Sequence, residues 1–270
     1  MNRIDVCIET FYSHLPYAER LKKVSELGFK FYEFWFPEKR FDGKGLAPEV
    51  KDFDELADLN ARYGLTATDF VFNHPDGGVV ASLIEKKDRA RLTDEIGRVS
   101  RLAKRIGCTK LICGSGNRVP GLRREEALDN MTEALAALAP LCDREGITLI
   151  LEPFNSRVDH PDYFLDDPHA CVEVLSRVNH PNVKMLFDIY HMQIMDGNIV
   201  AFLRENIRHV GHFHIAGVPG RHEPYACELN YPFILKEIDR LGYTGYVGLE
   251  YWPTVDNGES LKRTLKYLAE

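Results

Sequence analysis

Short apolar runs alternate with longer amphipathic stretches from one end of the chain to the other. Runs of four to seven residues rich in Ile, Val, Leu and Phe predict buried β-strands, and they cover residues 4–8, 31–36, 66–72, 110–113, 148–151, 183–187, 210–215 and 246–250. Apolar residues at three- and four-residue spacing predict amphipathic helices at 17–27, 53–63, 87–106, 123–145, 168–178, 199–206, 231–241 and 260–269. Eight strands, each followed by a helix, predict the α/β fold class and a (β/α)8 TIM barrel.

Several of the predicted helices end at a glycine directly before the next strand. These glycines are Gly28, Gly64, Gly107, Gly146 and Gly242. Glycine tolerates the left-handed conformation that commonly ends a helix. Each of these glycines therefore marks where one helix ends and the next strand begins. No linker rich in Pro, Ser or Gly interrupts the pattern, and we expect residues 1–270 to form a single domain. A doubly wound sheet is disfavoured, because no G-x-G-x-x-G motif follows the first strand.

Length and charge narrow the classes of partner. The 270 residues match one barrel, for which about 250 are typical. With 34 basic and 41 acidic residues, the formal net charge of −7 would repel phosphate backbones and anionic lipids. We therefore expect no nucleic-acid partner and no membrane partner. The first residues lack the pattern of a signal peptide, which favours a cytoplasmic location. The six cysteines form no Cys-x-x-Cys pair and are expected to be reduced.

Residues that can bind a divalent cation stand at the ends of the last four predicted strands. Barrels of this type carry their chemistry at the C-terminal ends of the strands and in the loops that follow. The residues in question are Glu152, Asp188, His214 and Glu250. Buried carboxylates that converge on one barrel end would repel one another and are costly to desolvate. A metal would remove both costs, and three carboxylates with one imidazole suit Mn²⁺, Mg²⁺ or Co²⁺. The alternative is that each acid caps a helix or pairs with Arg or Lys.

Two further histidines and one arginine lie close to these strand ends. His191 follows Asp188 by three residues and is predicted to contact substrate. His212 precedes His214 by two residues, so it faces the same way one layer deeper, where we expect a buried, hydrogen-bonded side chain. Arg221, in the long loop after the seventh strand, either binds an anionic group of the substrate or pairs with Glu223.

Other residues near the strand ends complete the predicted site. Aromatic side chains could wall a small polar substrate from water, namely Phe34, Trp35, Phe72, Phe154 and Trp252. Histidines in the connecting segments, among them His160, are expected at the surface.

Several segments resemble those of hydroxypyruvate isomerases, within the xylose isomerase-like barrel group that also holds the ketose 3-epimerases. The segments are Leu151-Glu-Pro-Phe-Asn155, Phe187-Asp-Ile-Tyr-His-Met-Gln193, Gly211-His-Phe-His-Ile-Ala216, Arg221-His-Glu-Pro224 and Gly248-Leu-Glu-Tyr251. The resemblance implies that Glu152 and Glu250 are proton donor and acceptor, and that both bind the metal with Asp188 and His214. It also implies that His191 and Arg221 touch substrate. Some hydroxypyruvate isomerases carry Gln at the position of His214, whereas the epimerases carry His, which leaves the substrate open.

The predicted function is therefore a metal-dependent isomerase of a small hydroxy-oxo acid. Its first candidate reaction converts hydroxypyruvate to tartronate semialdehyde through an enediolate. The alternatives are a ketose 3-epimerase or other sugar isomerase, a metal-dependent dehydratase, a barrel that only binds a sugar, and an endonuclease IV-like barrel, against which the net charge argues. The partner is a small-molecule substrate. The sequence leaves the oligomeric state open, and a homo-oligomer is compatible with it.

Overall fold

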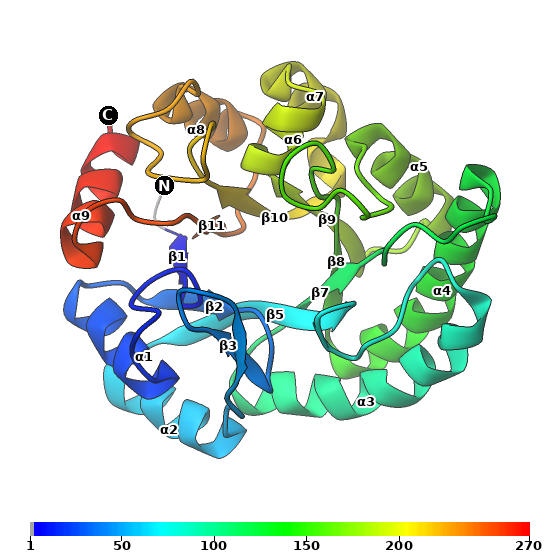
Figure 1. The fold of residues 1–270 in the computed structure, drawn as a ribbon, viewed down its shortest axis with the longest axis horizontal. Coiled ribbons are helices and arrows are strands. Elements are labelled where there is room, and N and C mark those ends of the chain that lie inside the picture. The colour runs from blue at the N-terminus through cyan, green and yellow to red at the C-terminus, as the bar shows by residue number, and fades with distance from the viewer. Residues whose placement is uncertain (1–2) are drawn as a thin grey trace.

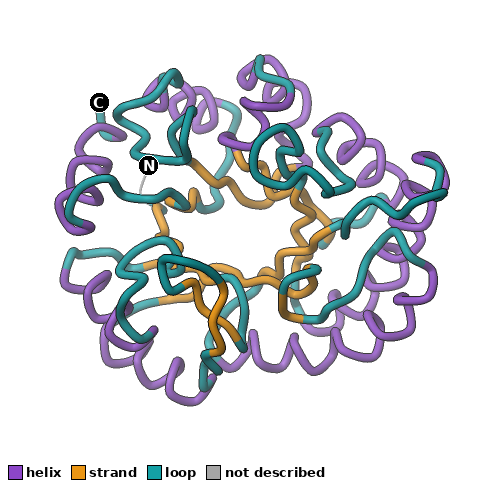
Figure 2. Tube along the Cα trace, in the orientation of Figure 1, coloured by secondary structure: helices purple, strands orange, loops and turns teal. Residues whose placement is uncertain are grey.

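A computed structural model describes residues 3–270 as a closed barrel of eight parallel strands ringed by helices (Figures 1 and 2). The barrel strands are β1 (Ile4–Cys7), β2 (Phe31–Phe34), β5 (Thr66–His74), β7 (Lys110–Gly114), β8 (Thr148–Glu152), β9 (Val183–Asp188), β10 (Val210–Ile215) and β11 (Val247–Leu249). They pair in this order, and β11 pairs with β1 to close the ring. The predicted fold class and the eight predicted strands are confirmed.

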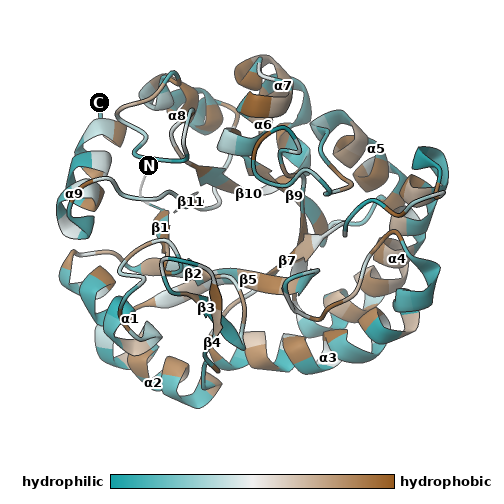
Figure 3. Cartoon of the chain, viewed as in Figure 1, coloured by the Kyte–Doolittle hydropathy of each residue, from teal (hydrophilic) through white to brown (hydrophobic). Residues whose placement is uncertain are grey.

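The helices pack around the outside of the barrel and bury one face each; their alternating apolar and polar bands are visible in Figure 3. They are α1 (Tyr17–Glu26), α2 (Phe53–Tyr63), α3 (Arg89–Arg105), α4 (Arg124–Glu145), α5 (Pro168–Val178), α6 (Ile189–Met195), α7 (Ile199–Asn206), α8 (Tyr231–Arg240) and α9 (Asn257–Leu268). Short 3₁₀ turns at Lys86–Asp88 and Ile207–His209 precede α3 and β10. The glycines predicted to end helices adopt positive φ angles, from 63° at Gly64 to 90° at Gly28. None of the helices formed by residues 3–270 has the length and apolar character needed to cross a membrane.

Several short elements were not predicted from the sequence, among them helix α6. The antiparallel pair β3 (Lys39–Phe41) and β4 (Leu46–Pro48) forms a hairpin after β2, and β6 (Gly77–Gly78) folds back on β5. The hairpin is held by buried charges, because Glu9 accepts hydrogen bonds from the Phe41 backbone N–H and pairs with Lys51 at 2.9 Å. Lys51 Nζ also donates to the Phe36 carbonyl at 2.8 Å. This charged anchor fixes the hairpin beside the C-terminal end of the barrel, called the barrel mouth below.

The barrel interior is apolar on one side and polar on the other. Successive residues of a strand point alternately into the barrel and toward the helices. The apolar side is formed by Val71, Ile112, Ile150 and Leu186, a small cluster separate from the main core between strands and helices. The polar side is formed by Asp5, Glu33, Asp69 and His212, all buried. His212 has no exposed surface and lies 3.2 Å from Glu33. Its predicted place as a buried, hydrogen-bonded histidine is confirmed.

Candidate active site

The four strand-end residues named as metal ligands meet at the barrel mouth. Glu152 ends β8, Asp188 ends β9, His214 lies in β10 and Glu250 follows β11. One potential ligand atom from each lies within 4.8 Å of those of the other three, and all four side chains are buried. The strand register sets His214 beside Asp188 on one neighbouring strand and beside Gly248, two residues before Glu250, on the other.

The two carboxylate oxygens of Asp188 lie in different environments. Its Oδ1 caps α6 by accepting from the backbone N–H of Tyr190 at 2.8 Å and of His191 at 3.4 Å. Its Oδ2 has no hydrogen-bond partner although it is buried. The helix-capping alternative raised by the sequence is therefore correct for one oxygen, while the other remains available to a ligand.

The His214 ring lies between carboxylates at the centre of the site. Its Nδ1 lies 3.1 Å from Glu250 Oε2 and 3.5 Å from Glu152 Oε1, and its Nε2 lies 3.0 Å from Glu33 Oε2. Burial by itself would lower the pKa of His214, but Glu33 and Glu250 outweigh it and raise that pKa well above its usual value. The position therefore favours positive charge, whether carried by a proton or by a bound cation.

The two glutamates occupy different electrostatic environments. Glu250 accepts from Trp35 Nε1 at 2.6 Å and forms a close ion pair with Arg221. Burial would raise the pKa of Glu250, but Arg221 and His214 outweigh it and hold that pKa far below its usual value. Burial raises the pKa of Glu152 to about 7, although the nearby His214 lowers it. Two carboxyls with such different proton affinities are suited to complementary acid and base roles.

His191 is held from one side by Asn155, which the sequence analysis did not single out. Asn155 Nδ2 lies 2.7 Å from His191 Nδ1, so the amide donates to this nitrogen and leaves the proton on Nε2. His191 Nε2 lies 3.4 Å from Asp188 Oδ2. Burial, followed by the charge of Arg221, lowers the pKa of His191 well below its usual value, which keeps the ring neutral. His191 is fully buried, and its contact with substrate remains a prediction.

Arg221 pairs with Glu250 and lies 3.7 Å from Asp188, so the structure gives no support to pairing with Glu223. Glu223 instead accepts from Thr254 and Ser260. Arg221 adopts a left-handed backbone conformation with φ of 57°. Its buried Nε has no partner, which leaves one guanidinium donor free at the site.

A small pocket of about 120 Å³ opens over Glu152, His214, Arg221 and Glu250, whereas Asp188 and His191 do not line it. It is lined by Trp35, Phe36, Leu46, Val71, His74, Asp76, Ile112, Glu152, Phe154, His160, His214, Arg221 and Glu250. Leu46 comes from the β3–β4 hairpin, which thus forms part of the wall. His160 packs against Phe154 with ring centroids 4.5 Å apart. The expectation that His160 lies at the surface is wrong, because the loop after β8 folds back over the mouth.

Of the residues in the predicted aromatic wall, Trp35 and Phe154 line the pocket, whereas the prediction is wrong for Phe34 and Phe72. Phe34 stacks on Phe70 at 4.9 Å and packs with the main core between strands and helices, as does Phe72. The alternation of side chains along a strand explains the error, because a residue next to an inward-facing one must point outward. Trp252 lies beside Trp35, with ring centroids 6.0 Å apart, but does not line the pocket.

The donor set fits a divalent cation. Three carboxylates and one imidazole converge, and the buried Asp188 Oδ2 and His214 Nδ1 have no hydrogen-bond partner. Arg221 compensates one of the three negative charges. Oxygen-rich sites of this kind suit Mn²⁺, Mg²⁺ or Co²⁺.

Fold and site together define a barrel of the enzyme class, with buried carboxylates and a histidine at its mouth that could hold a cation. The model of the xylose isomerase-like TIM barrel family matches residues 21–270, and the chain belongs to that family. It is 32% identical over 272 residues to a 2-oxo-tetronate isomerase of Cupriavidus necator, with 99% of each chain covered. It is 41% identical over 171 residues to a putative hydroxypyruvate isomerase of Danio rerio; that match covers 61% of this chain and only 62% of the relative.

A solved structure shows the same fold over nearly the whole chain. It is described as an AP endonuclease, family 2, from Brucella melitensis, and it superposes with a TM-score of 0.87 at 31% identity, covering 99% of both chains. The resemblance to isomerases stated from the sequence, and the prediction of an enzyme of this class, are confirmed by these relatives.

Proposed function

We propose that this protein is a metal-dependent isomerase of a small hydroxy-2-oxo acid, with hydroxypyruvate to tartronate semialdehyde as its first candidate reaction. The observation that carries the proposal is the convergence of Glu152, Glu250 and Arg221 on one pocket of about 120 Å³. Two carboxyls can exchange a proton with adjacent carbons, and the guanidinium can bind a carboxylate. The names of the relatives from Cupriavidus necator and Danio rerio agree with this class of substrate.

The reaction moves one proton between neighbouring carbons. One glutamate removes a proton from C3 of hydroxypyruvate, and the electron pair forms the enediolate. A proton delivered to C2, together with transfer of the hydroxyl proton from the C3 oxygen to the C2 oxygen, gives the product with no net gain or loss of atoms. A divalent cation held by Glu152, Asp188, His214 and Glu250 would supply Lewis-acid polarisation of the carbonyl. The His191 Nε2 proton and the free Arg221 Nε donor would stabilise negative charge on the substrate oxygens.

Arg221 is held ready for an anionic substrate by its own ion pairs. Its contacts with Glu250 and Asp188 fix the guanidinium in the site before substrate binds, which lowers the entropy lost on binding. Trp35 and Phe154 line the same pocket, where their rings would shield a bound substrate from water. A three- or four-carbon acid suits the small volume.

The direct test is a substrate panel on the purified protein with Mn²⁺. The panel holds hydroxypyruvate, four-carbon hydroxy-2-oxo acids and free ketoses, and we expect the acids to have the higher kcat/KM. Proton NMR in D₂O should show deuterium entering the carbon that accepts the proton. Faster turnover of neutral ketoses would favour the second candidate, a ketose 3-epimerase that uses the same two glutamates and carries His at the position of His214.

Metal binding is a separate expected result. Calorimetry on protein treated with a chelator and then dialysed should show one Mn²⁺ bound per chain, and Mn²⁺ at a hundred times its Kd should stabilise the fold by about 2.7 kcal/mol. Asp188→Asn should weaken binding, because Oδ2 is the unpartnered oxygen of the site. If Mn²⁺, Mg²⁺ and Co²⁺ all leave the melting temperature of the wild type unchanged, the metal requirement is wrong.

A further inference from the structure

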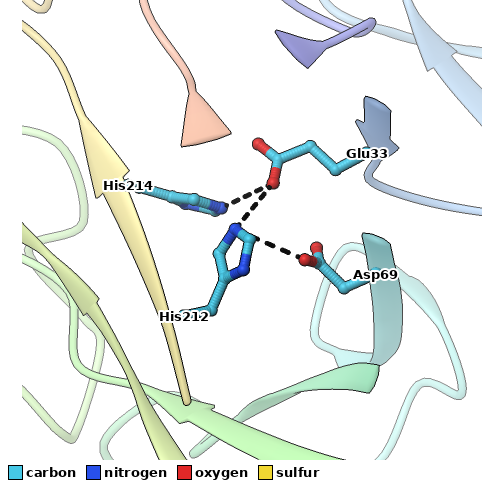
Figure 4. Close-up of side chains that lie close together, drawn as sticks. All are labelled: Glu33, Asp69, His212 and His214. Carbon is cyan, nitrogen blue, oxygen red and sulfur yellow. Dashed lines mark hydrogen bonds and ion pairs between the residues drawn. The ribbon is translucent and has the colours of Figure 1, made fainter. Parts of the chain in front are cut away.

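Beneath the proposed metal ligands lies a second layer of buried polar side chains (Figure 4). Glu33 of β2 faces two histidines of β10, and its Oε2 lies 3.2 Å from His212 Nε2 and 3.0 Å from His214 Nε2. Asp69 of β5 lies 3.4 Å from His212 Nε2. All four side chains are at most 2% exposed. The interior of such a barrel is ordinarily filled with branched apolar residues. A layer of buried carboxylates and histidines is therefore unusual and points to a role in the site.

The Glu33 contact determines which nitrogen of His214 is available to a metal. A ring nitrogen that donates to a carboxylate keeps its proton, so the neutral ring carries its lone pair on the other nitrogen. With Nε2 donating to Glu33, the lone pair lies on Nδ1. His214 Nδ1 is the nitrogen that faces Glu152 and Glu250, at 3.5 and 3.1 Å. The hydrogen bond from His214 Nε2 to Glu33 thus leaves the lone pair of Nδ1 free to bind a metal.

The neighbouring strand leaves room for this contact. A Cβ atom added at Gly248 of β11 would lie 2.7 and 2.8 Å from the two carboxylate oxygens of Glu33 and 2.8 Å from His214 Cδ2. These separations are too short for unstrained contact. The φ angle of Gly248 is not positive, so any residue could adopt its backbone conformation. Glycine is needed at this position because it has no side chain to collide with Glu33 and His214.

We propose that Glu33 is a positioning residue that holds His214 with Nδ1 directed at the metal. This inference rests on the metal site proposed above and extends it to a residue outside the ligand set. Carboxylates that accept from the second nitrogen of a metal-binding histidine fix its tautomer and orientation and raise its basicity as a ligand.

Asp69 supplies a matched control within the same layer. It is as buried as Glu33 and faces the same His212, but among residues 3–270 it forms no ion pair with His214. Substitution of Asp69 therefore tests how far the layer tolerates the loss of a buried carboxylate. Only loss of Glu33 removes the partner of the metal-binding ring.

The experiment compares Mn²⁺ affinity by calorimetry in the wild type, Glu33→Leu, Glu33→Gln and Asp69→Asn. We expect Glu33→Leu to raise the Kd roughly 10- to 100-fold, the range found when such partners are removed. Glu33→Gln keeps the shape and an accepting oxygen without the charge, so it should have a smaller effect and should fold if the leucine variant does not. Asp69→Asn should stay within about threefold of the wild type. The visible absorption of bound Co²⁺ should change in the Glu33 variants and not in Asp69→Asn, because it reports the geometry of the ligands.

Three results would overturn the proposal. The first is a Glu33→Leu variant that binds Mn²⁺ within about threefold of the wild type, or, if that variant does not fold, a Glu33→Gln variant with unchanged affinity and an unchanged Co²⁺ spectrum. The second is an equal loss in Asp69→Asn, which would indicate general damage to the layer. The third is a second Mn²⁺ per chain that disappears in Asp69→Asn, since Glu33 would then bind a cation of its own. A wild type that binds no metal would instead refute the proposed metal site, and this inference with it.

Discussion

Glu152→Gln and Glu250→Gln should each lower kcat by at least about a hundredfold. General acid–base help is worth about 10²–10⁴ in rate, and glutamine keeps the shape of the side chain while losing the ability to carry the proton. The measurement is the initial rate on hydroxypyruvate or the best acid of the panel, at saturating Mn²⁺. Metal content must be determined in each variant, because both residues also face the proposed cation site.

Glu223→Gln is the matched control for these two variants. Glu223 is also a buried glutamate beside the mouth, but it accepts from Thr254 and Ser260 and does not line the pocket. Its kcat should remain within a few-fold of the wild type. Full activity of either Glu152→Gln or Glu250→Gln with metal bound would exclude that glutamate from proton transfer.

Arg221→Ala should raise KM for an acid substrate roughly 10- to 100-fold. A charge-assisted hydrogen bond to the substrate carboxylate contributes about 1.5–3 kcal/mol, which corresponds to that range. Arg221→Lys should recover only part of the loss, because a point charge cannot reproduce the guanidinium fork. Steady-state kinetics on the three proteins gives the comparison.

A neutral ketose serves as the internal control for Arg221. The alanine variant also leaves Glu250 without its ion-pair partner, and that damage affects every substrate equally. The part of the effect due to the substrate carboxylate is the difference between acid and ketose. If Arg221→Ala slows both alike, and the wild type prefers the ketose, the epimerase is the correct function.

The barrel could be predicted from the sequence because its signals are local. Apolar runs such as 148–151 and 183–187, and helix-ending glycines such as Gly64 and Gly146, each depend on a few neighbouring residues. The rule that function lies at the strand ends then located Glu152, Asp188, His214 and Glu250 without any knowledge of contacts. The β3–β4 hairpin was missed because its anchor, the Glu9–Lys51 pair, joins residues far apart in the sequence.

The partners of the site residues were decided only by the tertiary structure. Trp35 donates to Glu250 across 215 positions of sequence, and Glu33 reaches His214 across 181. No local pattern encodes such contacts, because barrel closure alone brings the first strands beside the last ones. The sequence by itself determined the fold and placed the four strand-end residues at the mouth. Closure of the barrel determined the pKa values and the orientations of these side chains. A buried carboxyl takes its pKa from the charges that surround it in space.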